Sequence, residues 1–330
     1  MRLSRTLLGL SLVASLLAAA CGGGEKEAAK PTAAAPETPA AEATAPAVTT
    51  YPLTVTDMLG RSVTINAAPK AVAAISPTTV EYVYAVGGTS VTRSTSVQYP
   101  QEATSAVDIG PSYQPNLELV AAQNPDLIIA DSVIQPQLTQ SLEALKIPVL
   151  YAGAQNFDDV ITGLQLVGQV LDHQAEAGAT ASDLQEALTH IQSLLPAAKP
   201  KVLILNGAPT DFYAAKPESY VGNLVDLLGG QNVAAGAPDV GRFPGYTQLS
   251  LEAILTSAPD VILAITAGPP GGPTITGDLS ANPAWAQVPA VQNNRVSEIS
   301  VEIYLQAPGP RVGEALAELA KLLYPEVFVR

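Results

Sequence analysis

Two stretches of this chain repeat one pattern of residues. Residues 116–130 read NLELVAAQNPDLIIA, and residues 250–264 read SLEAILTSAPDVILA. In each stretch a polar residue suited to a helix N-cap precedes a short helical segment, a Pro-Asp pair follows it, and an aliphatic run then predicts a buried strand. The same helix and strand unit therefore occurs twice, which indicates two lobes of similar construction.

Other predicted strands and helices alternate around both copies. Before and after the first copy we expect a hairpin at 53–65, a strand at 71–76, a helix from Thr78 to Gly87-Gly88, a helix at 137–145 and a strand at 148–151. Around the second copy we expect a strand at 201–205, a helix at 219–230, a strand at 295–299 and a final helix at 312–323. This order predicts an α/β fold with two lobes and mostly parallel central sheets.

A long amphipathic helix is predicted between the two lobes. The stretch ASDLQEALTHIQSLLP at 181–196, together with the residues before it, places apolar side chains at steps of three and four, and Pro196 ends the pattern. Its apolar positions are Ala177, Ala181, Leu184, Leu188, Ile191 and Leu195. We expect a helix packed on both lobes to allow only small relative motion. The predicted domains are a first lobe at 51–170, the backbone helix at 171–196 and a second lobe at 197–330.

The N-terminus resembles that of an exported lipoprotein. Residues 1–20 carry Arg2 and Arg5, an apolar run and three alanines, and Cys21 follows as the one cysteine of the chain. The apolar run is shorter than the roughly 20 residues that span a bilayer, which favours a cleaved signal peptide. Residues 21–50 are rich in Ala and Pro and predict a tether. We expect an extracytoplasmic protein anchored by lipid at Cys21, with an ordinary signal peptide and an incidental cysteine as the alternative.

Composition and motifs argue against several classes of function. The net charge of −14 and the lack of a basic stripe disfavour nucleic acid as a partner. The two histidines, His173 and His190, lie in or beside the backbone helix without paired cysteines, so we predict no metal site. No nucleophile elbow, P-loop or dinucleotide fingerprint is present. We therefore expect neither an enzyme nor a bound cofactor.

Aromatic and amphipathic side chains gather in segments that follow strands or precede helices. Such segments border the crevice where ligands bind in α/β sheets. Local packing explains any one of them equally well, but the set predicts a cleft for a large, partly apolar ligand. The predicted ligand-binding residues are Tyr99, Tyr113, Gln114, Asp131, Phe212, Arg242, Phe243, Tyr246, Tyr304 and Gln306, and Tyr213 lies beside Phe212 in the same predicted loop.

The order of these motifs resembles a known family. The segments TVTDMLGRSVTI, AAISPTTVEYVYAVGG, PAWAQVPAVQNNRVSEI and GPRVGEALAELAKLLYPE, with the repeated stretches and the backbone helix, look like the helical-backbone class of ABC-importer substrate-binding proteins over residues 53–326. The resemblance implies two α/β lobes that hold cobalamin, a ferric siderophore or haem between them and catalyse no reaction. It further implies that Glu118 and Glu252 form salt bridges with arginines of a membrane permease. Helix capping by Asn116 and Ser250, with each glutamate favoured at a helix N-terminus, is the alternative explanation.

The resemblance leaves several ligands open. Tyr113, Asp131, Phe212, Tyr246, Tyr304 and Gln306 fall at or near positions where cobalamin-binding members contact the corrin, although tyrosine and phenylalanine stand here in place of tryptophan. Haem-binding members place an iron-ligating tyrosine where this chain has Pro111, which counts against haem; Tyr113, two residues further on, is the alternative ligand. A ferric siderophore would use Arg242, with Arg311 as a second candidate that we expect to begin the last helix and to point away from the cleft.

A corrinoid is the leading prediction, a ferric siderophore the next, and an enzyme on the same scaffold a remote one. We expect a monomer whose partners are the ligand, the permease and, through lipid, the membrane.

Overall fold

The computed structural model describes residues 48–240, 244–269 and 271–328, all within one compact unit. The predicted signal peptide, Cys21 and nearly all of the predicted tether lie outside the described residues. Arg242 and Phe243 lie outside them as well. No helix in the described ranges combines the length and the apolar character needed to cross a membrane.

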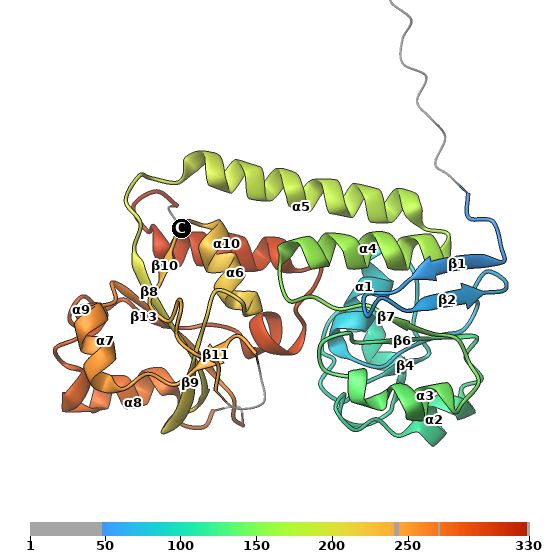
Figure 1. Ribbon diagram of the computed structural model, residues 1–330, viewed down its shortest axis with the longest axis horizontal. Coiled ribbons are helices and arrows are strands. Elements are labelled where there is room, and N and C mark those ends of the chain that lie inside the picture. Colours follow the sequence, from blue (N-terminus) through green and yellow to red (C-terminus); the bar gives the residue numbers. More distant parts are fainter. Residues whose placement is uncertain (1–47, 241–243, 270, 329–330) are drawn as a thin grey trace, which may run out of the picture. The chain divides into compact units, whose positions relative to one another are not determined.

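The first lobe is built on small sheets covered by helices (Figure 1). Its central sheet is parallel with the strand order β3-β6-β7, and an antiparallel hairpin, β1-β2, packs beside it. Its strands are β1 (Leu53–Thr56), β2 (Ser62–Ile65), β3 (Val72–Ala74), β4 (Thr92–Arg93), β5 (Val107–Asp108), β6 (Leu127–Ala130) and β7 (Val149–Tyr151). Its helices are α1 (Pro77–Ala85), α2 (Leu117–Ala122), α3 (Thr139–Glu143) and α4 (Phe157–Leu171), with 3₁₀ turns at Gln101–Ser105 and Pro136–Leu138.

The second lobe contains a six-stranded mixed sheet. The order β11-β9-β8-β12-β13 is parallel from β8 onward, β10 pairs with β8, and β9 and β11 run antiparallel. The strands are β8 (Lys201–Ala208), β9 (Asp211–Ala215), β10 (Gln231–Asn232), β11 (Tyr246–Thr247), β12 (Val261–Thr266) and β13 (Val296–Glu298). The helices are α6 (Tyr220–Leu227), α7 (Leu251–Ser257), α8 (Ile275–Ala281), α9 (Pro289–Gln292) and α10 (Val312–Leu323), with a 3₁₀ turn at Pro283–Trp285 and a π-helical turn, η4, at Glu302–Gln306.

The repeated stretches form the same unit in each lobe, as the sequence predicts. Asn116 caps α2 by accepting hydrogen bonds from the backbone of Glu118 and Leu119, and Ser250 caps α7 through the backbone of Ala253. β6 and β12 follow, each with buried aliphatic side chains. The α/β fold with two lobes and mostly parallel central sheets is therefore confirmed.

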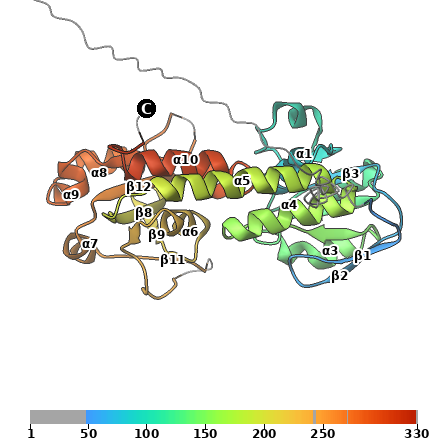
Figure 2. The same cartoon turned by 90° about the horizontal axis from the view of Figure 1, so that it is seen from above.

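The predicted backbone helix is α5 (Gln174–Leu194), and it packs against a helix from each lobe. Figure 2 shows α5 running alongside α4 at one end and α10 at the other. Gly168 of α4 allows the close approach, because a Cβ there would overlap the Cβ of Ala177. At the other end, a Cβ on Gly313 would lie 3.1 Å from Leu184 Cδ2. All five predicted apolar positions inside α5 are buried.

Two segments for which the sequence predicted a structure differ from that prediction. Residues 211–215, predicted as a loop, form β9, because Gly207 with φ 142° lets the chain fold back closely after an extended β8. The predicted helix at 137–145 is shorter, since a 3₁₀ turn occupies its first residues.

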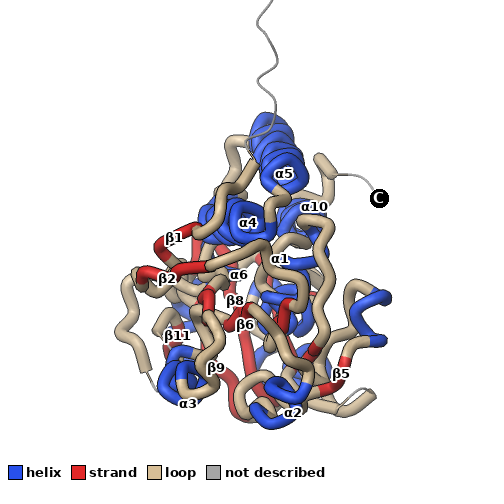
Figure 3. The backbone as a smooth tube through the Cα atoms, turned by 90° about the vertical axis from the view of Figure 1, so that its right-hand side faces the viewer, coloured by secondary structure: helices blue, strands red, loops and turns tan. Residues whose placement is uncertain are grey.

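One hydrophobic core crosses from lobe to lobe. It contains side chains of α1 and α4 in the first lobe, of α5, and of α6 and α10 in the second, including Tyr82, Leu164, Leu188, Leu224 and Leu316. Seen along α5, helices α1, α4 and α10 lie beneath it (Figure 3). Two separate clusters fill the outer faces of the two sheets. The shared core supports the expectation of small relative motion between the lobes.

Candidate functional site

In the first lobe, Asp131 shapes a turn at the carboxyl end of β6. Its carboxylate is buried, and Oδ1 accepts hydrogen bonds from the backbone N–H groups of Val133 at 2.7 Å and Ile134 at 3.1 Å. Burial raises the pKa of Asp131, although these hydrogen bonds oppose the rise. The turn leaves the side chains of Val133 and Ile134 40% and 37% exposed. Asp131 thus acts through the backbone and presents two apolar side chains at the end of the sheet.

Gln135 joins this turn to the loop that carries Tyr113. Its side-chain nitrogen donates to the carbonyl oxygens of Ser112 at 2.6 Å and Ile75 at 3.0 Å, while its oxygen accepts from the backbone of Asp131 at 2.8 Å. Tyr113 is 67% exposed, and Gln114 next to it is also exposed. The structure therefore brings Tyr113 and Gln114 beside the turn with Val133 and Ile134.

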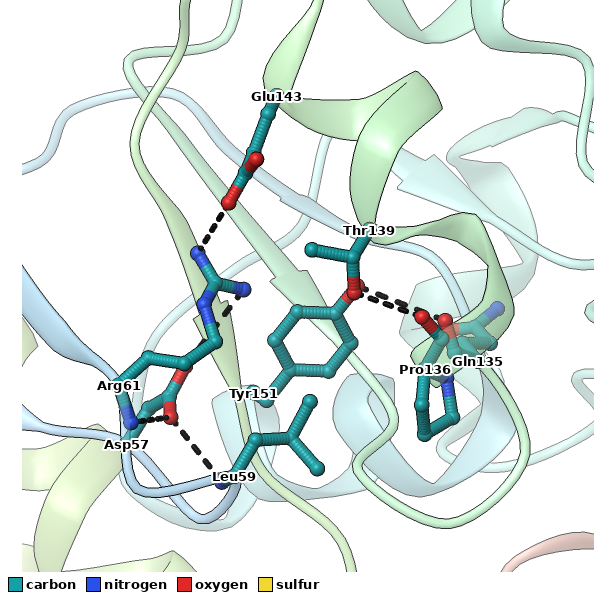
Figure 4. A network of polar contacts seen from close by, with 8 residues as sticks. All are labelled: Asp57, Leu59, Arg61, Gln135, Pro136, Thr139, Glu143 and Tyr151. Carbon is teal, nitrogen blue, oxygen red and sulfur yellow. Dashed lines mark hydrogen bonds and ion pairs between the residues drawn. The ribbon is translucent and has the colours of Figure 1, made fainter.

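A polar network holds the tip of the β1-β2 hairpin against the same edge (Figure 4). Arg61 lies between Asp57 and Glu143, with N···O distances of 3.8 and 3.1 Å, and its guanidinium carbon is 5.0 Å from the centre of the Tyr151 ring. The Tyr151 hydroxyl is 2.8 Å from Thr139 Oγ1, and burial raises its pKa. Because Arg61 and Tyr151 each contact neighbouring side chains from other segments of the lobe, we regard this network as a support for the loops above it.

In the second lobe, three polar side chains share one face of the sheet near the carboxyl end of β8. Asn206 is directly opposite Tyr213, and Tyr246 is opposite Ala215, two residues further along β9. Residues paired across antiparallel strands lie on the same face, as do residues two apart. Burial raises the pKa of the Tyr246 hydroxyl, and the amide of Asn206 beside it opposes the rise.

Asn206 is a candidate site residue outside the set predicted from the sequence. Its side-chain oxygen Oδ1 is buried and has no hydrogen-bond partner among the described residues. A buried acceptor without a partner is costly, so a ligand group that donates to it would be favoured. The available signal was the polar residue that interrupts the aliphatic run KVLILN at the end of β8.

Several predicted ligand residues lie elsewhere. Tyr304 is 1% exposed, and its hydroxyl donates to Glu318 Oε2 at 2.8 Å and lies 3.0 Å from the carbonyl oxygen of Ala315, which opposes any contact with a ligand. Phe212 packs edge-on against Trp285, with ring centres 6.1 Å apart. Gln306 is exposed at the end of η4. The structure does not bring Tyr304 and Phe212 to the faces described above, because Tyr304 is buried in the core shared by the lobes and Phe212 packs against the outer cluster of the second lobe.

Tyr99 borders a different cavity. This cavity of about 350 Å³ lies between α1, α5 and the start of α10, and Tyr99 alone of the eight described ligand predictions lines it. The guanidinium carbon of Arg311 is 4.5 Å from the centre of the Tyr99 ring. Arg311 precedes α10, as expected, and it binds Glu81 and Glu302.

The described edges of both sheets carry no unpaired cation. Arg61, Arg93, Lys216 and Arg311 each form an ion pair with a carboxylate. The other described lysines and arginines precede strands, begin β8 or lie in α10, away from the carboxyl ends of the strands: Lys70, Lys146, Lys199, Lys201, Arg295 and Lys321. In the described ranges we also find no group of three or more His, Cys, Asp or Glu residues arranged to hold a metal ion.

Glu118 and Glu252 occupy matching positions on the two lobes. Each lies in the first turn of its helix, α2 or α7, and each is exposed. Neither forms an ion pair with another described residue. In Figure 1, α2 and α7 both lie on the side of the described unit away from α5.

Comparison with known proteins places this architecture in a family. A cobalamin-binding protein of Halobacterium salinarum is 25% identical over 300 residues, covering 88% of this chain and 79% of that protein. An uncharacterised ABC transporter substrate-binding lipoprotein of Bacillus subtilis, YvrC, is 25% identical over 288 residues, covering 84% and 87%. The crystal structure of Staphylococcus aureus IsdE complexed with haem matches with a TM-score of 0.66 at 22% identity, covering 78% and 100%. The model of the periplasmic binding protein family matches residues 72–301, most of the chain, so the protein belongs to the periplasmic binding protein family.

Proposed function

We propose that this protein is the extracytoplasmic binding component of an ABC importer and that it captures a large, corrinoid-like ligand between its two lobes. The proposed lobes are residues 51–170 and 197–330, and residues 171–196 form the backbone helix between them. The observation that carries the ligand class is the neutral character of the described site. Its first-lobe part contains Tyr113, Gln114, Val133 and Ile134, and its second-lobe part contains Asn206, Tyr213 and Tyr246. Cobalamin is electrically neutral overall and bears many amide groups, so aromatic faces and amide partners suit it.

A ferric siderophore is the second candidate. Many ferric siderophores and both haem propionates carry negative charge, which requires cations at the site. The described edges offer none that is unpaired, and Arg242, outside the described residues, is the remaining arginine predicted there. For haem, Pro111 also stands where the resemblance implies that haem-binding members have an iron-ligating tyrosine. The charge balance therefore favours the corrinoid.

Calorimetric titration of the purified protein distinguishes these ligands. We expect cyanocobalamin to bind, and ferric tris-catecholate and haemin to bind at least tenfold more weakly, because their negative charge lacks partners. Binding of the ferric chelate or of haemin with no binding of cyanocobalamin would replace the corrinoid proposal by the corresponding alternative. Tyr113→Ala serves as the matched variant that separates binding at the site from nonspecific association.

The exposed glutamates support docking to a permease. Glu118 and Glu252 project from the same position in the two repeated units, and no described residue neutralises either. A matched acidic residue on each lobe suits a partner that presents basic residues at two related positions. Because exposed ion pairs contribute little affinity, we assign them to orientation and encounter.

Lipid anchoring through Cys21 completes the proposal. The matching protein of Bacillus subtilis is named as a lipoprotein, and Cys21 of this chain follows an apolar run and small residues. Metabolic labelling with a radioactive fatty acid is expected to mark the full chain and to fail with Cys21→Ala. Equal labelling of both would exclude this residue as the attachment point.

A further inference from the structure

One ion pair joins the two lobes within the described part of the chain. Arg311 precedes α10, and its Nε lies 3.0 and 3.1 Å from the two carboxylate oxygens of Glu81 in α1, while Nη2 also contacts that carboxylate. The two side chains are 10% and 2% exposed. Every other described ion pair connects residues of a single lobe or of α5. Arg311 and Glu81 thus form the charged contact across the lobe boundary.

Groups from both lobes fix the guanidinium of Arg311. Its Nη2 lies 2.7 Å from Glu302 Oε1 of η4 in the second lobe. In the first lobe, besides Glu81, the ring of Tyr99 covers the guanidinium at 4.5 Å. A planar guanidinium that is held by two carboxylates and one ring has a single favourable orientation. A small rotation of one lobe relative to the other would break these contacts.

Stability alone does not explain this pair. Burying two charges costs free energy that their attraction does not always return. Burial raises the pKa of Glu81 to about 7, even though Arg311 binds it and opposes the rise. The shared apolar core already attracts the lobes to each other, but apolar contacts are not directional. The pair adds direction to that attraction.

The helix that carries Glu81 leads to the first-lobe part of the proposed ligand site. Ser76 caps α1, the helix of Glu81, and its hydroxyl donates to Asp131 Oδ2 at 3.4 Å. Asp131 forms the turn with Val133 and Ile134. On the other side, η4 begins at Glu302 and ends at the exposed Gln306.

We propose that Arg311 is a positioning residue: by holding Glu81 and Glu302 together, it sets the relative orientation of the lobes and thereby the alignment of the two parts of the ligand site. The consequence for affinity rests on the proposed function. The role of Arg311 in setting the orientation of the lobes does not rest on it, because that orientation is measured without any ligand.

The test measures the distance between the lobes directly. In the full chain with Cys21→Ser, cysteines introduced at the exposed positions Gln140 of α3 and Ser280 of α8 carry spin labels for pulsed electron double resonance. We compare this parent with E81Q, with R311K, and with R93Q, which breaks an ion pair inside the first lobe. We expect broader distance distributions in E81Q and R311K and the parent width in R93Q, because one ammonium cannot reproduce the guanidinium contacts.

Affinity gives the second measurement. If R311K reduces the aligned orientation to one tenth of the population, the Kd for cyanocobalamin rises about tenfold. Parent distributions in both E81Q and R311K would overturn the proposal, and so would equal broadening in R93Q. Should E81Q not fold, as judged by circular dichroism, R311K decides, since it keeps the positive charge. If the parent binds no cyanocobalamin, the proposed function fails while the distance measurement still decides the role of Arg311.

Discussion

Asp260 Oδ2 accepts a hydrogen bond from the backbone N–H of Lys201 at 2.8 Å, and Asp126 Oδ2 accepts the matching bond from Lys70 at 2.8 Å in the other lobe. Each aspartate also pairs through its own backbone, Asp260 with Lys201 and Asp126 with Ala71. The Pro-Asp pair of each repeated stretch therefore ties the start of one strand to its neighbour. This contact explains why the aspartate occurs twice.

We predict that Asp126→Ala and Asp260→Ala each lower the free energy of unfolding by about 1 kcal/mol, because each removes an acceptor of exposed backbone N–H groups. The double variant should show the sum, since the two sites share no partner. Urea unfolding followed by circular dichroism measures these changes. Asp183→Ala, at an exposed position in α5, is the control and should stay within about 0.5 kcal/mol of the parent. Losses no larger than that control would contradict the structural role of the pair.

The contact of Gly168 with Ala177 leads to a second prediction. Gly168→Ala would force a methyl group into the α4 and α5 interface, so we expect a loss of about 1–3 kcal/mol of stability from overpacking. Gly178→Ala is the matched control, because nothing lies within 4 Å of a Cβ at that position in α5. There the better helix propensity of alanine should raise stability by up to about 1 kcal/mol. Thermal unfolding compares the two variants. Equal shifts of their unfolding temperatures would exclude the close packing of α4 on α5 at Gly168.

These glycines also show why part of the fold was not predictable. No element is predicted from the sequence for residues 157–171, where Gly163 and Gly168 fall within a mixed apolar and polar stretch. In α4 both glycines are required by packing, since a Cβ on Gly163 would overlap the ring of Tyr82 in α1. A helix with regular apolar spacing is predicted closely, as the match of 312–323 to α10 shows.

The site was predictable only in part for a related reason. Tyr113 and Tyr304 both occupy segments beside regular elements, and the sequence does not distinguish them. Tyr304 is buried against α10, a helix that follows later in the chain. Its hydroxyl forms hydrogen bonds there with Glu318 and with the carbonyl oxygen of Ala315. For Asn206 the sequence offers only a polar residue in the run KVLILN, and the register of β8 and β9, which places it opposite Tyr213, makes it a site candidate. Burial and register depend on tertiary partners, which local patterns do not specify.

A third prediction separates ligand contacts from core residues. Tyr113→Ala and Asn206→Ala should each raise the Kd for cyanocobalamin at least tenfold, through lost aromatic contact and a lost amide partner, with little change in thermal stability. Tyr304→Phe should do the reverse. It removes a buried hydroxyl that donates to Glu318, so we expect a loss of about 1–2 kcal/mol of stability and an unchanged Kd. Calorimetric titration and thermal unfolding of the three variants decide, and the interpretation fails if Tyr304→Phe alone weakens binding.

The last prediction concerns the two exposed glutamates. Reversing both charges, in Glu118→Arg with Glu252→Arg, should abolish ligand uptake by cells that carry the importer, because two repulsive contacts replace two attractive ones at the permease. Ligand binding by the purified variant should remain at the parent level, since both side chains are exposed and lie outside the loops of the proposed site. Each single reversal should reduce uptake partially. Asp183→Arg, an exposed reversal on α5, adds the same change of charge as each single reversal but on another face, and it should leave uptake intact. Unchanged uptake in the double variant would show that docking uses another surface. Glu118 and Glu252 would then be explained by their favourable position at a helix N-terminus, after the caps Asn116 and Ser250.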